Sequence, residues 1–317
     1  MTLSRRAALG AGLVTLLSTR PAAASTTLRV GTFKGQDELI LKSSGQQNFP
    51  YGVDYHYFSS GQLEVEALNA NALDYGGCSE IPLAFAAAAQ AEIKIVATLR
   101  GDVNDQVVLV PKNSPIQSIA DLKGKRVGYV RATTSQYYLL RMLWQAGLDV
   151  SDIQAINLSP SDGAAAFAQG ALDAWAIYGY AINFAQASNG ARILRTAKGI
   201  LSGNYFVAVQ PAVLTDPAKR AAVANYLVRI RNGYAWVEAN KAAWCATLAP
   251  VIHVPLPFVQ SQFYHESQPD RVVPIDDAAI ASAQQVADTF IKAKLLPGPI
   301  DVAPYFDRSF GPSLAKV

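Results

Sequence analysis

Residues 126–144 read RVGYVRATTSQYYLLRMLW, and this stretch passes from a strand through a polar turn into a helix. Residues 126–130 are short and mostly apolar, and Thr133 and Gln136 have the spacing of a helix-capping box. Leucines and a tryptophan then recur with helical spacing over the next residues. A strand that leads directly into a helix of this length is typical of parallel sheets with right-handed crossover connections.

The opening residues of this stretch belong to an internal repeat. RVG at 126–128 also occurs at 29–31, ALD at 171–173 also occurs at 72–74, and ILRTAKG at 193–199 resembles IVATLRG at 95–101. Each match is short, but all three occur in the same order with offsets of 97 to 99 residues. This regularity predicts two lobes that share one topology.

Both units alternate strands with helices. We expect strands at residues 28–32, 53–58, 73–77, 93–99, 126–130, 153–158 and 174–177, and helices ending near 47 and at 62–71, 81–90, 135–146 and 162–169. Two further apolar stretches, 106–110 and 205–209, link the units, and the tail is predicted to be helical after Pro217 and over 276–291.

The pattern predicts an α/β protein of two lobes, each with a parallel-rich sheet flanked by helices. The chain crosses to the second lobe near residue 108 and returns near 207. Lobe I therefore comprises 25–107 plus 208–317, and lobe II comprises 108–207. Two crossing strands side by side form a hinge, an arrangement that lets lobes close around a ligand.

The N-terminus has the features of an export signal. Arg5 and Arg6 precede an apolar run at 7–17 that is too short to cross a membrane, and small residues near Ala24 offer a cleavage site. We expect a signal peptide at residues 1–24 and a periplasmic protein that is not lipidated, since no cysteine lies near the cleavage site. Ser4-Arg5-Arg6 also resembles a twin-arginine signal.

Charge and cysteine content exclude several function classes. Cleavage after residue 24 would leave 24 basic and 24 acidic residues, so the sequence does not indicate nucleic-acid binding. The three histidines have no metal-ligand spacing with the two cysteines, and we predict neither a metal nor a cofactor. Cys78 and Cys245 could form one disulfide or remain two buried thiols.

Ligands of open α/β sheets bind beyond the carboxyl ends of the strands, where helix N-termini meet. The best candidate is the turn at 131–136, in which Arg131, Thr133, Thr134 and Ser135 could bind an oxyanion together with free helix N–H groups. The alternative is that Thr133 only caps its own helix and Arg131 is solvated.

The other candidate contacts follow the remaining strands. They are Lys34, Gln36, Ser60, Gly61, Gln62, Cys78, Ser79, Glu80, Trp175, Tyr178 and Tyr205. Lys34 could instead be solvated, Glu80 could cap a helix, and Trp175 could belong to a core. A catalytic Cys78 would need a neighbouring base, and no histidine lies in a predicted ligand loop.

Four stretches of the chain match a family. SSGQLEVEALNANALDYGG, VLVPKNSPIQSIADLKGKRVGYVRATTSQYYLL, AGLDVSDIQAINLSPSDGAAAFAQGALDAWAIY and AQQVADTFIKAKLLPGPIDV resemble the sulfonate/nitrate/taurine group of periplasmic binding proteins, and most closely the aliphatic-sulfonate binders. The resemblance implies a type II binding-protein fold, a sulfonate held at helix N-termini of both lobes, and delivery to an ABC permease and its ATPase by a monomeric protein.

Two departures bear on the ligand. The family usually has Trp-Asp-Pro where this chain has Tyr178-Gly179-Tyr180, so an acidic side chain is lost and an aromatic one is gained. This predicts a more apolar or bulkier ligand than amine-bearing taurine. Cys78-Ser79-Glu80 also replaces the Gly/Asp-type turn that is common at that loop.

Several alternatives remain open from the sequence. Nitrate or a thiamine-type pyrimidine precursor would suit the same fold, although the aromatic residues disfavour nitrate. A desulfinase-like enzyme could use the same scaffold, but the first-strand loop at 32–36 contains no cysteine. A sensory domain is disfavoured by the signal peptide.

Overall fold

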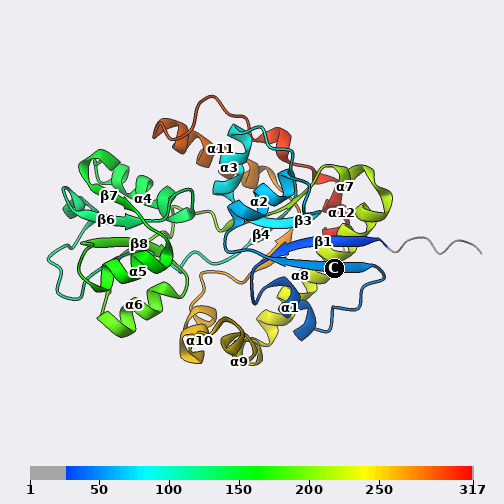
Figure 1. Ribbon diagram of the computed structural model, residues 1–317, viewed down its shortest axis with the longest axis horizontal. Helices are drawn as coiled ribbons and strands as arrows, with labels where there is room; N and C mark the ends of the chain where they lie inside the picture. The colour runs from blue at the N-terminus through cyan, green and yellow to red at the C-terminus, as the bar shows by residue number, and fades with distance from the viewer. Residues whose placement is uncertain (1–25, 316–317) are drawn as a thin grey trace, which may run out of the picture.

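The computed structural model describes residues 26–315, so the expected signal peptide lies outside the described residues. Figure 1 shows two bodies side by side, one built from the middle of the chain and the other from its first and last parts. Each body contains one sheet with helices on both faces. The predicted two-lobe α/β architecture is confirmed.

Lobe I is built on the larger sheet. Its strand order is β11 (Arg271–Val273), β4 (Lys94–Arg100), β10 (Asn204–Val209), β3 (Tyr75–Ser79), β1 (Thr27–Thr32) and β2 (Gly52–Tyr57). The side chains of β10 alternate between two cores: Val207 and Val209 face one, and Phe206 and Ala208 face the other. The first core contains α1 (Asp37–Ser43) and α8 (Pro217–Ala239), and the second contains α2 (Gly61–Asn69), α3 (Glu80–Ala88) and α11 (Asp277–Lys292).

Lobe II repeats this plan with five strands. Their order is β7 (Gln154–Asn157), β6 (Arg126–Tyr129), β8 (Ala174–Tyr178), β5 (Gln106–Val110) and β9 (Arg192–Thr196). Helix α4 (Thr134–Gln145) covers one face, and α5 (Pro160–Ala168) and α6 (Ala181–Asn189) cover the other. The limits predicted for the lobes, 107 and 207, lie close to the starts of β5 and β10 and stay a prediction.

Both sheets are mixed, which refines the expectation of parallel-rich sheets. β1 runs parallel to β2 and β3, and β6 runs parallel to β7 and β8. β10 runs antiparallel to β3 and β4, and β5 runs antiparallel to β8 and β9. β5 and β10 are the strands that have just crossed from the other lobe, and the short β11 of the tail also pairs antiparallel with β4.

The sequence repeat corresponds to one ion pair made twice. The backbone N and Nε of Arg29 donate to Oδ2 of Asp74 at 3.0 and 3.1 Å, and the guanidinium also donates to Oδ1 at 2.7 Å. Arg126 makes the same three bonds to Asp173, at 2.8, 3.1 and 2.8 Å. The pairs join β1 to the residue just before β3 in lobe I, and β6 to the residue just before β8 in lobe II, which explains why RVG and ALD recur together.

The two crossings meet between the lobes and form the hinge, residues 101–105 and 197–203. The backbone N–H of Gly101 donates to the carbonyl of Gly203 at 2.9 Å. Gly203 has φ +77°, and a Cβ there would lie 2.7 Å from that Gly101 carbonyl oxygen. The side chain of Gln268 donates to the same oxygen at 2.8 Å, so the loop before β11 adds a third segment to the predicted two-strand hinge.

The tail returns to lobe I and reaches lobe II at two places. Phe258 of α10 (Leu256–Tyr264) packs edge-on against Phe184 of α6, with ring centroids 5.2 Å apart. On the α11 side, the Lys292 ammonium lies 4.4 Å from the ring centroid of Trp144 in α4. The remaining elements are α7 (Ala212–Thr215), α9 (Lys241–Ile252), α12 (Gly311–Ala315) and the 3₁₀ helices η1 (Ile119–Leu122), η2 (Val150–Asp152), η3 (Ala303–Tyr305) and η4 (Arg308–Phe310).

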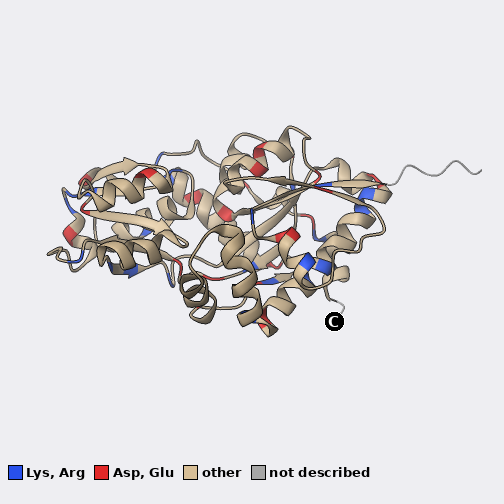
Figure 2. Ribbon diagram, turned by 60° about the horizontal axis from the view of Figure 1, so that its bottom comes forward, with Lys and Arg blue, Asp and Glu red and all other residues tan. Residues whose placement is uncertain are grey.

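Charged residues are interspersed over the ribbon of both lobes (Figure 2), in keeping with the nearly equal numbers of acidic and basic residues. None of the helices in residues 26–315 is both long enough and apolar enough to span a bilayer.

Candidate functional site

The expected ligand loops of both lobes lie beside the hinge. In lobe I, Tyr205 at the start of β10 pairs with Ser79 at the end of β3. In lobe II, Gln106 at the start of β5 pairs with Tyr178 at the end of β8. Because each crossing strand begins beside the end of a parallel strand, the carboxyl ends of the parallel strands in both sheets face the same junction. Ligands of open α/β sheets bind at such ends.

In lobe I, two candidate loops pack directly on each other. Ser60 caps α2, since its hydroxyl accepts from the N–H of Leu63 at 3.4 Å. A Cβ on Gly61 would lie 3.0 Å from the Cα of Cys78, so only glycine lets the start of α2 approach the end of β3 this closely. Gln62 is exposed and donates to Glu66 at 3.0 Å, so it does not point back to the cap.

A buried carboxyl group that the sequence did not single out supports these loops. Glu64 is 1% exposed, and its Oε2 accepts from the N–H of Gly77 at 2.6 Å. Its Oε1 is buried and has no partner among the described residues. Burial raises the pKa of Glu64 to about 8, against the opposing hydrogen bond from Gly77, so folding favours the protonated form of this group. The sequence feature that could have indicated this packing is Gly76-Gly77 in β3, where the lack of side chains leaves room for Glu64.

The loop from Cys78 to Glu80 faces inward. Cys78 is 4% exposed, and burial raises the pKa of its thiol well above the ordinary value, which leaves it a poor nucleophile. Glu80 is also buried, and its carboxylate accepts from Ser202 at 2.7 Å and from Asn204 at 3.2 Å. Glu80 therefore anchors the returning segment of the hinge.

In lobe II, the hydroxyl groups before α4 are mostly engaged with their own turn. Thr133 caps the helix as expected, accepting from the N–H of Ser135 at 3.3 Å, and donates to the carbonyl of Val130 at 2.8 Å. The predicted capping box with Gln136 is wrong, because the Gln136 side chain accepts from the N–H of Ala132 and not from that of Thr133. Ser135 is fully buried, and its hydroxyl accepts from the N–H of Val130 at 3.0 Å. Ala132 has φ +56°, an uncommon conformation held by a 2.7 Å hydrogen bond from its N–H to the Gln136 side chain.

Thr134 links this turn to the hinge. Its hydroxyl donates to the Gln106 side chain at 2.7 Å, and its own N–H has no acceptor within the described chain. Tyr178 is half-buried and lies opposite Gln106 in the β5–β8 register. Thr133, Thr134, Tyr178 and Gln106 thus form one polar cluster, of which Gln106 was missed because only the β5–β8 register brings it there.

The other expected contacts lie apart from this cluster. Trp175 is fully buried in lobe II, and a Cβ on Gly163 of α5 would lie 2.7 Å from its Nε1. Lys34 is exposed, with its Nζ 3.4 Å from Nε2 of His253. Gln36 is exposed at the start of α1. Arg131 is exposed, and its N–H donates to the Asn157 side chain at 2.9 Å.

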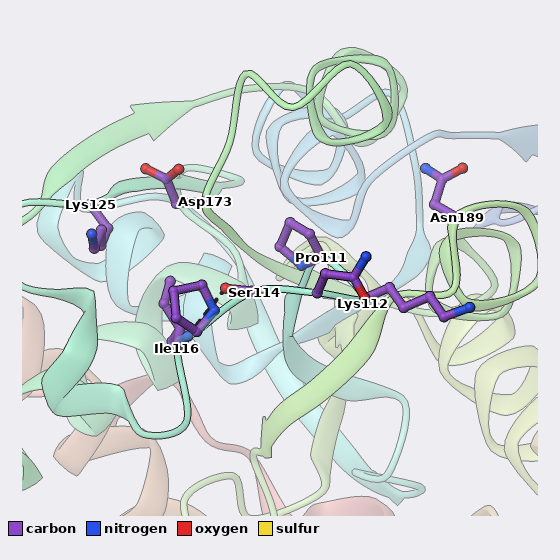
Figure 3. Close-up of a pocket in the computed structure, with 9 residues that line it drawn as sticks. Pro111, Lys112, Ser114, Ile116, Lys125, Asp173 and Asn189 are labelled. Atoms are coloured by element: carbon purple, nitrogen blue, oxygen red, sulfur yellow. Dashed lines mark hydrogen bonds between the residues drawn. The ribbon is translucent and has the colours of Figure 1, made fainter.

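A separate cavity of about 470 Å³ lies in lobe II, at the ends of the strands that are farther from the hinge. Figure 3 shows Lys112 and Asn189 on one side of it and Lys125 and Asp173 on the other. Lys112 follows β5, Lys125 and Asp173 directly precede β6 and β8, and Asn189 ends α6. The cavity therefore belongs to the amino ends of the parallel strands, away from the expected ligand loops.

The two cysteines of the described chain do not pair with each other. Cys78 and Cys245 are free and buried, and they belong to different cores. No group of His, Cys, Asp and Glu residues within 26–315 could hold a metal ion.

Comparisons with known proteins agree on one class. Residues 53–217 match the family model described as NMT1/THI5 like. An aliphatic sulfonates-binding protein of Escherichia coli (strain K12) is 32% identical over 92% of this chain and 92% of its own length. The alkanesulfonate-binding protein SsuA of Xanthomonas axonopodis pv. citri, solved bound to MOPS, is 31% identical with a TM-score of 0.81 over 91% of this chain and 100% of its own.

A desulfurization enzyme, DSZB, shares the fold. It aligns with a TM-score of 0.66 over 91% of this chain and 98% of its own, at 17% identity. At that identity the likeness concerns the fold alone.

Proposed function

The chain belongs to the NMT1/THI5-like family and, within it, to the aliphatic sulfonate-binding proteins, and from this premise we propose that it binds an organic sulfonate between its two lobes. It acts as the solute-binding component of an importer and catalyses no reaction. It is periplasmic, like the relatives it resembles.

The observation that carries this proposal is the pair of helix starts beside the hinge. Helix α2 begins at the Ser60 cap and α4 at the Thr133 cap, one in each lobe. A helix N-terminus provides N–H donors and a partial positive charge, and the N–H of Thr134 has no acceptor among residues 26–315. A chain with nearly balanced charges can bind an anion in this way without an excess of cations.

The proposed ligand contacts follow from this arrangement. They are Ser60, Gly61, Ser79 and Tyr205 in lobe I and Thr133, Thr134 and Tyr178 in lobe II, with Lys34, Gln36, Gln62 and Arg131 reaching the ligand as the lobes close. Cys78, Glu80, Ser135 and Trp175 are buried, so they would act mainly by holding the loops in place.

The partner would be a membrane permease of the ABC class with its ATPase, to which the closed form is delivered. We further propose that the protein is a monomer and that it is exported by the twin-arginine route, which Ser4-Arg5-Arg6 supports.

The test is calorimetric titration of protein stripped of ligand by unfolding and refolding. We expect alkanesulfonates to bind and nitrate, sulfate and thiamine-type pyrimidines not to bind. Ligand at a hundred times its dissociation constant should stabilise the fold by about 2.7 kcal/mol. Thr133→Ala/Thr134→Ala should weaken sulfonate binding by about tenfold or more, and Thr215→Ala, at an exposed site on α7, should leave it unchanged. Binding of nitrate or a pyrimidine in place of sulfonates would refute the proposal.

A further inference from the structure

Two acidic side chains at the hinge have no basic partner. Asp105 ends the outgoing crossing just before β5, and Asp270 lies just before β11. Among the described residues, neither carboxylate forms an ion pair with a lysine or arginine. Asp270 packs so closely on Gly101 that any larger residue there would overlap its carboxylate. Two uncompensated carboxyl groups thus lie next to the ligand loops.

Two buried acceptor oxygens, one on Asp105 and one on Gln262, have no donor among the described residues. Its Oδ2 accepts from the side-chain amide of Gln262 in α10 at 3.3 Å, whereas its Oδ1 is buried without any partner in the described chain. The Oε1 of Gln262 is likewise buried and unpartnered. Two touching side chains therefore present two unsatisfied acceptor oxygens, a costly arrangement unless a donor joins them.

The surroundings favour a cationic donor. Burial raises the pKa of Asp105 to about 7, and the nearby Asp102 raises it further, which an approaching cation would reverse. The pKa of Asp270 is raised to about 7 for the same reasons, burial first and then neighbouring carboxylates. The Tyr205 ring lies beside the same hinge segment as Asp270, since a Cβ on Gly101 would meet both the Asp270 carboxylate and Cε2 of Tyr205, the latter at 3.6 Å. Aromatic rings are good neighbours for an organic ammonium group.

The position of Asp105 connects these acceptors to the proposed sulfonate site. Asp105 directly precedes Gln106, whose side chain accepts from the hydroxyl of Thr134. The N–H of Gly179 donates to the Asp105 carbonyl at 2.9 Å, which fixes the crossing against the loop after Tyr178. A ligand held at Thr134 could therefore reach Asp105 with a short second arm.

We propose that Asp105 and Gln262, supported by Asp270, form a subsite for a protonated amine, so that the ligand is a zwitterionic aminosulfonate. This inference rests on the proposed sulfonate-binding function and names its ligand class. It opposes the sequence-based expectation of a ligand without an amine, because the hinge supplies the acidic group that Tyr178-Gly179-Tyr180 lacks.

The test compares two ligands of equal length, propane-1-sulfonate and 3-aminopropane-1-sulfonate, by calorimetry at pH 8. We expect the wild-type protein to bind the amino compound at least about tenfold more tightly. Asp105→Asn should abolish this preference while changing propane-1-sulfonate affinity by less than about threefold. Asp288→Asn, at an exposed carboxylate on α11, should leave both affinities unchanged.

Each outcome has a separate meaning. Equal affinity of the wild-type protein for both ligands, or a preference for propane-1-sulfonate, would overturn the amine subsite and leave sulfonate binding intact. A preference that persists in Asp105→Asn would overturn the assignment to Asp105. Failure of the wild-type protein to bind either sulfonate would refute the proposed function and the subsite with it. The wild-type comparison needs no variant, so it holds even if Asp105→Asn does not fold.

Discussion

Because the Arg–Asp ion pair occurs once in each lobe, the same substitution can be compared at a buried and at a more exposed position. Asp74→Asn and Asp173→Asn remove the same charge from the equivalent position of each lobe. Asp74 is 2% exposed and is bound by both Arg29 and Lys219, the latter at 2.7 Å. Asp173 is 30% exposed and has Arg126 as its one ion-pair partner among the described residues.

The two variants should therefore differ in stability. Burial alone would raise the pKa of Asp74, but hydrogen bonds from Arg29 and Lys219 outweigh it and lower the pKa below its ordinary value. Removing one partner of a buried pair costs about 3 kcal/mol, because the remaining charges lose their compensation. A half-exposed pair is worth about 1 kcal/mol. We expect Asp74→Asn to cost about 2 kcal/mol more than Asp173→Asn, with the difference arising in lobe I.

The assay is thermal unfolding by calorimetry at pH 7 and at pH 3. At about 2–4 °C for each kcal/mol, Asp74→Asn should melt roughly 5 °C below Asp173→Asn. A carboxylate whose pKa is lowered by folding stabilises the fold above its ordinary pKa and loses this contribution as the pH falls through the folded value. The difference in melting temperature between the two variants should therefore be smaller at pH 3 than at pH 7. Equal melting temperatures at pH 7 would refute the argument from burial.

Three further outcomes follow from close contacts and buried groups. Gly61→Ala should push the start of α2 away from β3 and weaken sulfonate binding, measured by calorimetry. The control Gly311→Ala, whose Cβ would meet its nearest neighbour at 3.7 Å, should leave binding unchanged, and equal affinities of the two variants would contradict the packing argument. Because the pKa of Glu64 is raised to about 8 by burial, the folded protein keeps a proton that the unfolded chain releases, so stability should fall as the pH rises from 5 to 8. In urea titrations Glu64→Gln should reduce this fall by about 1.4 kcal/mol per pH unit, and an unchanged slope would show that Glu64 is ionised when folded. Trp175→Phe should lower stability by about 1 kcal/mol and leave sulfonate affinity unchanged, since the ring is fully buried; lost binding would bring Trp175 back to the ligand site.

Much of the fold could be predicted because its cause is local. Strand–helix alternation and the cap at Thr133 are carried by residues near one another in sequence, and the repeat of RVG with ALD can be seen because both lobes keep the same order and spacing. The mixed direction of the sheets could not be predicted, because it depends on where β5 and β10 insert after crossing. The same holds for Ser60 as the cap of α2, where two adjacent serines offer equivalent sequence signals.

The candidate site divides in the same way. Loops at strand ends were predictable, and so was their polar composition. The hydrogen-bond partners of Glu80 could not be predicted. These partners are Ser202 and Asn204, which lie more than 120 residues away in the chain. Asp105 and Gln262 were missed for the same reason: only the return of the tail past the hinge brings them into contact.

The central position of β10 in the lobe I sheet fixes the order in which the lobes can be completed. Every strand of lobe II lies between residues 106 and 196, whereas β3 and β4 are separated until residues 204–209 pair with both of them. A chain emerging from the ribosome can therefore finish lobe II while lobe I still has two open strand edges. The nascent protein would then be most exposed to aggregation just before its β10 is synthesised, and the lobe encoded second would be the first to fold.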